Sequence, residues 1–178
     1  MLDDMDDRSD TPRRKPHRTK NRARIRVPGI APSAVFDMVC DLDQLADWNT
    51  AITHVVSRPH SLEPGAEWKV AMRDGPLRWI SRSTVVEHDP ESMVFAFRSG
   101  TDDGNPSYAE WRWSATTDGD GTILEVSWRL CPRTALRRWL LAPYRARRLR
   151  REVPMSLAEL ARHITASHRP AETAGRTT

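Results

Sequence analysis

The feature that most constrains this chain is a series of segments between residues 66 and 131 in which apolar and polar side chains alternate. In one of them Trp68 and Val70 alternate with charged residues, and the same period of two recurs in the later segments. This period is typical of β-strands that bury one face. The turn sequences DG, DP and DGDG separate the segments, and strands joined by tight turns pair antiparallel. The sequence therefore predicts an antiparallel meander.

Helical patterns flank this meander on both sides. The segment APSAVFDMVCD carries apolar residues at helical spacing, which predicts a short helix at about 32–40. After Pro132 the period becomes helical again. Pro143 is predicted to separate a short helix from a long one, and Pro154 to kink or break the long one. The long helix is marked by one apolar stripe, formed by Leu149, Val153, Leu157, Leu160 and Ile164.

Strands are also predicted at 22–27 and 50–58, so the order is strand, short helices, six antiparallel strands and a long helix. Strands and helices do not alternate along the chain. The order therefore predicts an α+β fold with the helices packed on one face of the sheet. We expect one domain, because 178 residues with 38% apolar positions can bury a single core.

Charge-rich segments lie at both ends of the chain. Residues 1–21 and 167–178 contain few apolar side chains, so burial cannot offset the entropy of ordering them. We expect a disordered charged arm, a folded domain at 22–166 and a disordered tail. No apolar run reaches the ~18 residues of a membrane span, and the acidic start does not resemble a signal peptide. The sequence thus predicts a soluble, cytoplasmic protein.

Cys40 and Cys131 are the only cysteines. Neither lies in a CxxC pair or at metal-ligand spacing from a histidine, so both are predicted to be small buried side chains. Zinc-protease, phosphate-loop and EF-hand patterns do not occur in the sequence. We therefore expect no metal and no cofactor.

Large aromatic side chains gather on the face of the predicted sheet that the long helix must cover. They either fill a core solidly or line a cavity, and both alternatives stay open. Ser81 and Ser83 favour the cavity, because hydroxyl and indole groups need hydrogen-bond partners that a dry core does not offer. A concave, mostly apolar site with a few polar groups is typical of small-molecule pockets. The predicted lining comprises Trp68, Val70, Met72, Trp79, Ser81, Ser83, Met93, Phe95, Phe97, Trp111, Trp113, Leu124, Val126, Trp128, Val153 and Leu157.

Five short motifs occur in a characteristic order: IAPSAVFDMVCDLDQLADWN, LEPGAEW, VEHDPESMVFAF, DGDGTILEVSW and LLAPY. With them the chain resembles the START-like (SRPBCC) superfamily over about residues 22–166, and more narrowly its bacterial polyketide cyclase/dehydrase and lipid-transport branch. The resemblance implies a helix-grip fold of the Bet v 1/START-like kind. In this fold a curved seven-stranded antiparallel sheet surrounds the long C-terminal helix and leaves a deep apolar cavity. The resemblance also places Trp48 near the rim of that cavity.

Proteins of this superfamily include enzymes, lipid carriers and sensors, so the fold leaves the function open. The first hypothesis is a binder of a lipid or polyketide-like molecule that acts as a carrier, a sensor or a weak cyclase. The second is a polyketide cyclase or dehydratase whose acid or base is Glu87, predicted to face the cavity with Ser81 and Ser83. His88 is predicted to lie on the opposite face, at the surface or an edge.

A third hypothesis rests on the segment from Arg133 to Arg151, which carries no acidic residue. Its arginines form a positive surface, and Trp139 and Tyr144 beside them could enter the interface of an anionic membrane. A solvated surface without a partner is the alternative. The segment lacks the interleaved aromatic residues of RNA-binding motifs, so nucleic acid is not favoured. Monomer and homodimer both stay open. The predicted basic surface comprises Arg137, Arg138, Arg145, Arg147, Arg148, Arg150 and Arg151.

Overall fold

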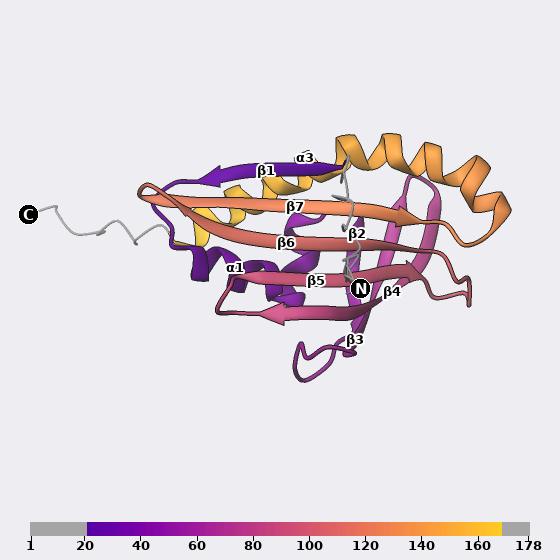
Figure 1. The fold of residues 1–178 in the computed structure, drawn as a ribbon, viewed down its shortest axis with the longest axis horizontal. Coiled ribbons are helices and arrows are strands. Elements are labelled where there is room, and N and C mark those ends of the chain that lie inside the picture. The colour runs from indigo at the N-terminus through magenta and orange to yellow at the C-terminus, as the bar shows by residue number, and fades with distance from the viewer. Residues whose placement is uncertain (1–20, 169–178) are drawn as a thin grey trace, which may run out of the picture.

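The computed structural model describes residues 21–168 (Figure 1). Most of the charged arm predicted at 1–21 and of the tail predicted at 167–178 lies outside this part of the chain. In chain order the elements are β1 (Arg22–Val27), α1 (Pro32–Cys40), η1 (Leu42–Gln44), α2 (Leu45–Trp48), β2 (Ile52–Ser57), β3 (Glu67–Asp74), β4 (Leu77–Asp89), β5 (Val94–Thr101), β6 (Tyr108–Asp118), β7 (Gly121–Cys131), η2 (Arg137–Leu141) and α3 (Ala142–Ser167).

The seven strands form one antiparallel sheet in the order β1-β7-β6-β5-β4-β3-β2. Strands β2 to β6 each pair with the next strand along the chain, and β1 pairs with β7. In Figure 1, β2 and β3 run steeply across the direction of β6 and β7, so the sheet is curved. The predicted fold is confirmed: a seven-stranded antiparallel sheet, short helices after the first strand and a long C-terminal helix.

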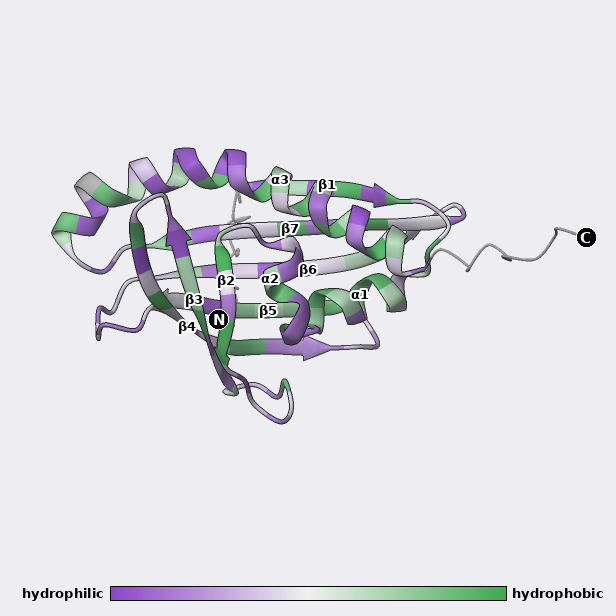
Figure 2. Ribbon diagram, turned by 180° about the vertical axis from the view of Figure 1, so that it is seen from behind, coloured by the Kyte–Doolittle hydropathy of each residue, from purple (hydrophilic) through white to green (hydrophobic). Residues whose placement is uncertain are grey.

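Helices α1, α2 and α3 lie on one side of the sheet (Figure 2). Helix α3 contacts β1 and α2, whereas α1 contacts β6 and β7. All five residues of the predicted apolar stripe of α3 are buried. The helix continues through Pro154, so the break predicted there is not found. Pro154 is exposed, and the backbone carbonyl that loses its hydrogen bond to the proline can be hydrated.

The turn into the long helix is a π-helix, η2, which continues without a gap into α3. Pro143 lies in the first turn of α3, directly after η2, and its fixed φ is compatible with a helix. The predicted separation at Pro143 therefore corresponds to the boundary between η2 and α3. Wide π-turns are rare and often occur beside functional sites.

One irregularity changes which residues of β4 face the helices. Val85 is opposite Phe97 and Glu87 is opposite Ala96, so Val86 is an extra residue in β4. This two-against-one arrangement is a β-bulge, which reverses the inward and outward alternation of the residues that follow. Before the bulge the odd-numbered residues face inward, and after it His88 does.

The core is most solid beneath the C-terminal half of α3. Leu157 is 1% exposed, and Leu160 and Ile164 are completely buried. They belong to one apolar cluster with buried side chains of β1, α1 and β7, including Val27 and Val126. Contact of this density leaves no room for a ligand between these side chains and the sheet.

Candidate functional site

A cavity of about 380 Å³ lies between the concave face of the sheet and the helices, toward the start of α3. Its walls come from strands β2 to β7, from the segment α1 to α2, and from η2 and the first turns of α3. Eleven of the predicted residues line it: Trp48, Trp68, Val70, Met72, Trp79, Ser81, Ser83, Phe95, Phe97, Trp111 and Trp113.

The remaining predicted residues do not line this cavity. Met93 is not in a strand but in the turn before β5, where its φ is 52°. The others share the apolar face of the sheet or of α3, yet they lie where the helix packs directly on the strands. They are core residues rather than cavity residues, and they comprise Leu124, Val126, Trp128, Val153 and Leu157.

The inner end of the cavity is aromatic. Trp68 stacks on Phe95 with ring centroids 6.0 Å apart, and Trp48 meets Trp113 edge to face at 5.9 Å. Trp48, the last residue of α2, is 3% exposed and lines the cavity. Within residues 21–168 the indole N–H groups of Trp48 and Trp113 have no hydrogen-bond partner.

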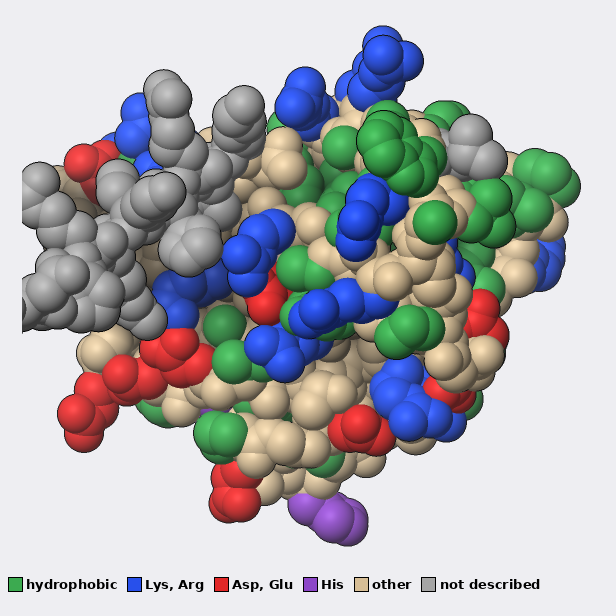
Figure 3. Space-filling model, turned by 45° about the vertical axis from the view of Figure 1, so that its right-hand side comes forward, with side chains coloured by type: hydrophobic (Ala, Val, Ile, Leu, Met, Phe, Trp, Pro, Cys, Tyr) green, Lys and Arg blue, Asp and Glu red, His purple; other side chains and the backbone are tan. Residues whose placement is uncertain are grey.

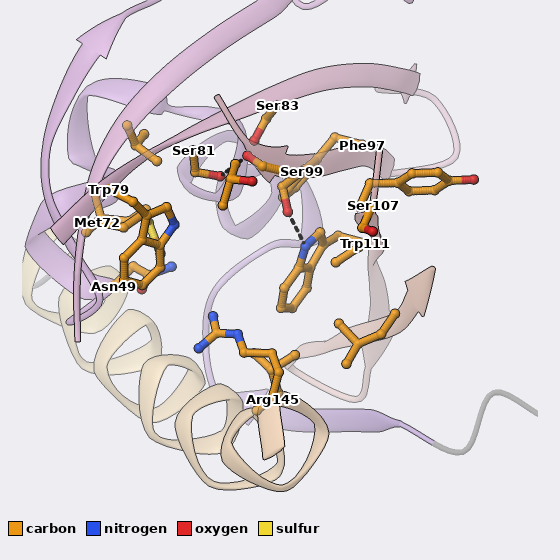
Figure 4. A pocket seen from close by; sticks show the side chains of 18 of the residues that line it. Asn49, Met72, Trp79, Ser81, Ser83, Phe97, Ser99, Ser107, Trp111 and Arg145 are labelled. Carbon is orange, nitrogen blue, oxygen red and sulfur yellow. Dashed lines mark hydrogen bonds between the residues drawn. The ribbon is translucent and has the colours of Figure 1, made fainter. Parts of the chain in front are cut away.

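Hydroxyl groups occupy the wall formed by β4 and β5 (Figure 4). Ser81 is opposite Thr101 and Ser83 is opposite Ser99, so the four side chains form two adjacent cross-strand pairs. Ser81 Oγ donates to the carbonyl of Gly100 at 3.1 Å. In Figure 4, Trp79 and Trp111 stand on either side of this wall, and Arg145 approaches from α3.

Ser99 and Thr101 were missed in the sequence, although the signal was present. They continue the alternation of Phe95 and Phe97 along β5. No comparable sequence signal marks the lining residues that come from the helices. These depend on how α2, η2 and α3 are placed against the sheet, and include Leu42, Leu45, Leu141, Tyr144 and Leu149.

The predicted inward orientation of Glu87 is wrong. The bulge at Val86 turns Glu87 to the outer face, where Arg112 donates to both of its carboxylate oxygens, one at 3.2 Å. The Glu87 side chain is 41% exposed. His88 takes the inward place and stacks on Phe36, with ring centroids 5.7 Å apart. Neither Glu87 nor His88 lines the cavity.

The mouth of the cavity carries charge that is already paired. Asp74 is the one carboxylate of the lining among the described residues, and it forms an ion pair with Arg148. Arg145 donates to Glu152 at 3.1 Å. Arg137 donates to Thr101 Oγ1 at 3.1 Å. Of the predicted basic surface, only Arg137 and Arg145 therefore reach the cavity.

Of the other predicted arginines, Arg148 is half-buried in its ion pair with Asp74, and the remaining four face outward beside apolar side chains. Arg138, Arg147, Arg150 and Arg151 are exposed, and Trp139 is 76% exposed. Figure 3 brings this end of the molecule forward and shows hydrophobic and basic side chains intermixed on its surface. The exposed apolar residues of η2 and its neighbours are Leu136, Trp139, Leu141 and Tyr144.

The two cysteines are free and lie in different surroundings. Burial and the nearby charge of Asp37 raise the pKa of the Cys40 thiol to about 12, whereas Cys131 lines the cavity. Within residues 21–168, no three histidine, cysteine or acidic side chains gather as a metal site. No helix in this part of the chain is long and apolar enough to cross a membrane.

Solved structures with this fold come from proteins of different kinds. The Zhui aromatase/cyclase from Streptomyces sp. R1128 is 19% identical, with a TM-score of 0.65 over 86% of this chain and 97% of that one. TTHA0849 from Thermus thermophilus is also 19% identical, with a TM-score of 0.63 over 83% and 98%. Ara h 8.0201 is 11% identical, with a TM-score of 0.64 over 82% and 96%.

The family follows from the sequence match rather than from these distant structures. A comparison with curated proteins found no match. The family model described as polyketide cyclase/dehydrase and lipid transport matches residues 18–165, which is most of the chain. This chain therefore belongs to the polyketide cyclase/dehydrase and lipid transport family.

Proposed function

We propose that the protein binds a small, mainly apolar molecule of the lipid or polyketide-like kind in its cavity, as a carrier or a sensor. The observation that carries the proposal is a volume of about 380 Å³ with aromatic walls and a small set of hydroxyl groups. Such a combination is typical of ligand sites, because apolar contact supplies affinity and a few polar groups supply orientation. Membership of a family that includes lipid transport agrees with this role.

The cyclase hypothesis loses the residue on which it depended. Glu87 holds its ion pair with Arg112 on the outer face, so its carboxylate cannot exchange a proton with a molecule in the cavity. Asp74 lies at the mouth and is paired with Arg148. We therefore propose binding without assigning a catalytic acid or base.

Native mass spectrometry of the full chain, followed by organic extraction, tests the binding proposal. We expect a defined apolar adduct, and we expect Ser81→Trp to abolish it because the indole would fill the cavity. Ser127→Trp is the matched control, since Ser127 lies on β7 opposite Arg112, on the outer face. A protein that carries no adduct and takes up no fatty acid, isoprenoid or aromatic polyketide would contradict the proposal.

A second function is favoured by the surface around the mouth. Leu141 and Tyr144 line the cavity and are also exposed, and Trp139 lies beside them in η2. Arg138 and Arg147 are exposed on the same segment. An amphipathic tryptophan among arginines suits the interface of an anionic bilayer. We propose that this surface docks on such a bilayer, so that a ligand can pass into the cavity without crossing water.

Liposome flotation with phosphatidylserine vesicles tests the docking. We expect binding at low salt that weakens steeply at physiological salt, and loss of binding in Arg138→Glu with Arg147→Glu. Arg24→Glu with Arg162→Glu changes the charge equally at sites on β1 and near the end of α3, and should bind almost as the wild type does. Equal losses in the two double variants would show a general charge effect and refute a specific docking surface.

A further inference from the structure

Ser83 and Ser99 are direct cross-strand partners on the cavity wall. Opposite residues of an antiparallel pair project from the same face with Cβ atoms about 4.5–5.5 Å apart. Ser83 is 3% exposed, and no hydrogen bond within residues 21–168 uses its hydroxyl. In the same residues, the unpaired side-chain atoms that are fully enclosed are three indole nitrogens. The Ser83 oxygen is not among them, so it faces the space of the cavity.

The hydroxyl proton of Ser99 is also unused in the described part of the chain. Trp111 Nε1 donates to Ser99 Oγ at 2.9 Å (Figure 4). An indole can only donate, so this bond occupies a lone pair of Ser99 and leaves its proton for another acceptor. The neighbouring hydroxyls differ, because Ser81 donates to Gly100 and Thr101 donates to Asp103 Oδ1 at 2.6 Å. Ser83 and Ser99 are therefore adjacent hydroxyls whose protons are both unused.

We infer that Ser83 and Ser99 form a subsite for a carbonyl oxygen of the ligand. A carbonyl oxygen has two lone pairs and no proton, so it can accept from both hydroxyls at once. Trp79 and Trp111 on either side offer flat apolar surfaces to the rest of the molecule. The inference rests on the proposed function and deepens it: the ligand is a ring compound that carries a ketone or similar carbonyl, rather than a plain hydrocarbon.

A pair of probes that differ only in the carbonyl tests this subsite. Isothermal titration calorimetry with the full chain compares 1-tetralone with tetralin, in the wild type and in the double variant Ser83→Ala with Ser99→Ala. We expect the variant to bind 1-tetralone about tenfold more weakly, as the loss of two neutral hydrogen bonds implies. Tetralin should bind within about twofold of the wild type, since it makes no hydrogen bond.

Control variants separate recognition from damage to the wall. Ser127→Ala removes a hydroxyl from the outer face and should change neither affinity, and Ser81→Ala should act weakly because its proton is already used. The melting temperature of unliganded Ser83→Ala should not fall, since Ser83 loses no partner, whereas Ser99→Ala removes the acceptor of the Trp111 indole and should lower it. Equal weakening of both probes, or an unchanged affinity for 1-tetralone, would overturn the subsite alone. A wild type that binds neither probe would overturn the proposed function and the subsite with it.

Discussion

The two ends of the domain use the same sheet face in opposite ways. Beneath the C-terminal half of α3, Leu157, Leu160 and Ile164 pack directly on the sheet and nothing is left open. Beneath the first turns of α3, the wall carries larger side chains, such as Trp79 and Trp111, yet a cavity remains. The bulk of the side chains therefore does not decide which end is filled. What differs is how closely the helix approaches the sheet.

The end of the domain that contains the cavity, beneath the first turns of α3, is the hollow end, and the end beneath the C-terminal half of α3 is the solid end. Ion pairs hold the hollow end together, whereas apolar packing holds the solid end. Arg148 links α3 to Asp74 at the tip of the β3–β4 hairpin. Lys69 and Arg82 both pair with Asp102 at the start of the loop after β5, the former at 2.7 Å. Ion pairs of this kind fix a geometry without filling the space beneath it, which suits a site that must admit a ligand.

The largest expected effect is on stability at the solid end. Leu157→Ala should lower the free energy of unfolding by about 3 kcal/mol, because it opens a cavity in a packed core. Met72→Ala in the wall of the existing cavity should cost about 1 kcal/mol or less, because the methionine is only partly buried. Urea denaturation of both variants measures the difference. Equal losses would mean that the two ends are packed alike.

Cysteine reactivity compares a side chain packed against the apolar core with one on the cavity wall, and it needs no substitution. Cys40 has its pKa raised to about 12 by burial and by Asp37, so almost none of it is thiolate at pH 8. Cys131 lines the cavity and should react with iodoacetamide at least about tenfold faster. Peptide mass spectrometry over time measures both rates, and a bound ligand should slow only Cys131. Faster labelling of Cys40 would reverse the comparison.

Acid should loosen the hollow end before the solid one. Hydrogen bonds from Lys69 and Arg82 hold the pKa of Asp102 below its ordinary value, and contacts from Thr101 and Asn105 do so for Asp103. A lowered pKa stabilises the folded state above the ordinary value of about 3.9, and this contribution is lost as the pH falls through the lowered pKa. Melting temperatures between pH 6 and pH 3 should therefore fall less in Asp102→Asn than in the wild type. If the melting temperatures of the wild type and of Asp102→Asn fall equally as the pH is lowered, the ion pairs of Asp102 do not contribute to the acid sensitivity of the fold.

The smallest effect is expected on the outer face. Glu87→Gln breaks an exposed ion pair with Arg112, which is typically worth less than about 1 kcal/mol. Ligand affinity should stay unchanged, since neither side chain reaches the cavity. Calorimetry with the 1-tetralone probe measures it, with Ser83→Ala as the comparison that should lose affinity. A loss in Glu87→Gln of similar size would restore the carboxylate as a ligand contact.

The strand pattern predicted the fold and much of the wall, because alternation alone decides which side chains share a face. Val70, Trp79 and Trp111 lie where that alternation places them. Alternation failed at Val86, where one extra residue reverses the pattern and carries Glu87 outward. A bulge depends on how two strands pair, and the sequence of one strand does not reveal it.

The extent of the cavity could not be predicted for a different reason. Leu124, Val126 and Trp128 have the same period and the same face as the true lining, but they belong to the packed apolar cluster and do not line the cavity. The approach of the helix is set by the whole stripe from Leu149 to Ile164 and by the turn in η2. The distance between α3 and the sheet depends on tertiary packing, and the residue pattern within one strand does not reveal it.

Five of the seven tryptophans line one small chamber: Trp48, Trp68, Trp79, Trp111 and Trp113. Tryptophan dominates the near-ultraviolet absorption and emission of a protein, so most of the light that this molecule emits should originate at the walls of its cavity. A conjugated ketone bound there would lie against several tryptophans at once and would quench their fluorescence. Binding of the ligand should therefore be measurable as a decrease in the intrinsic tryptophan fluorescence of the protein.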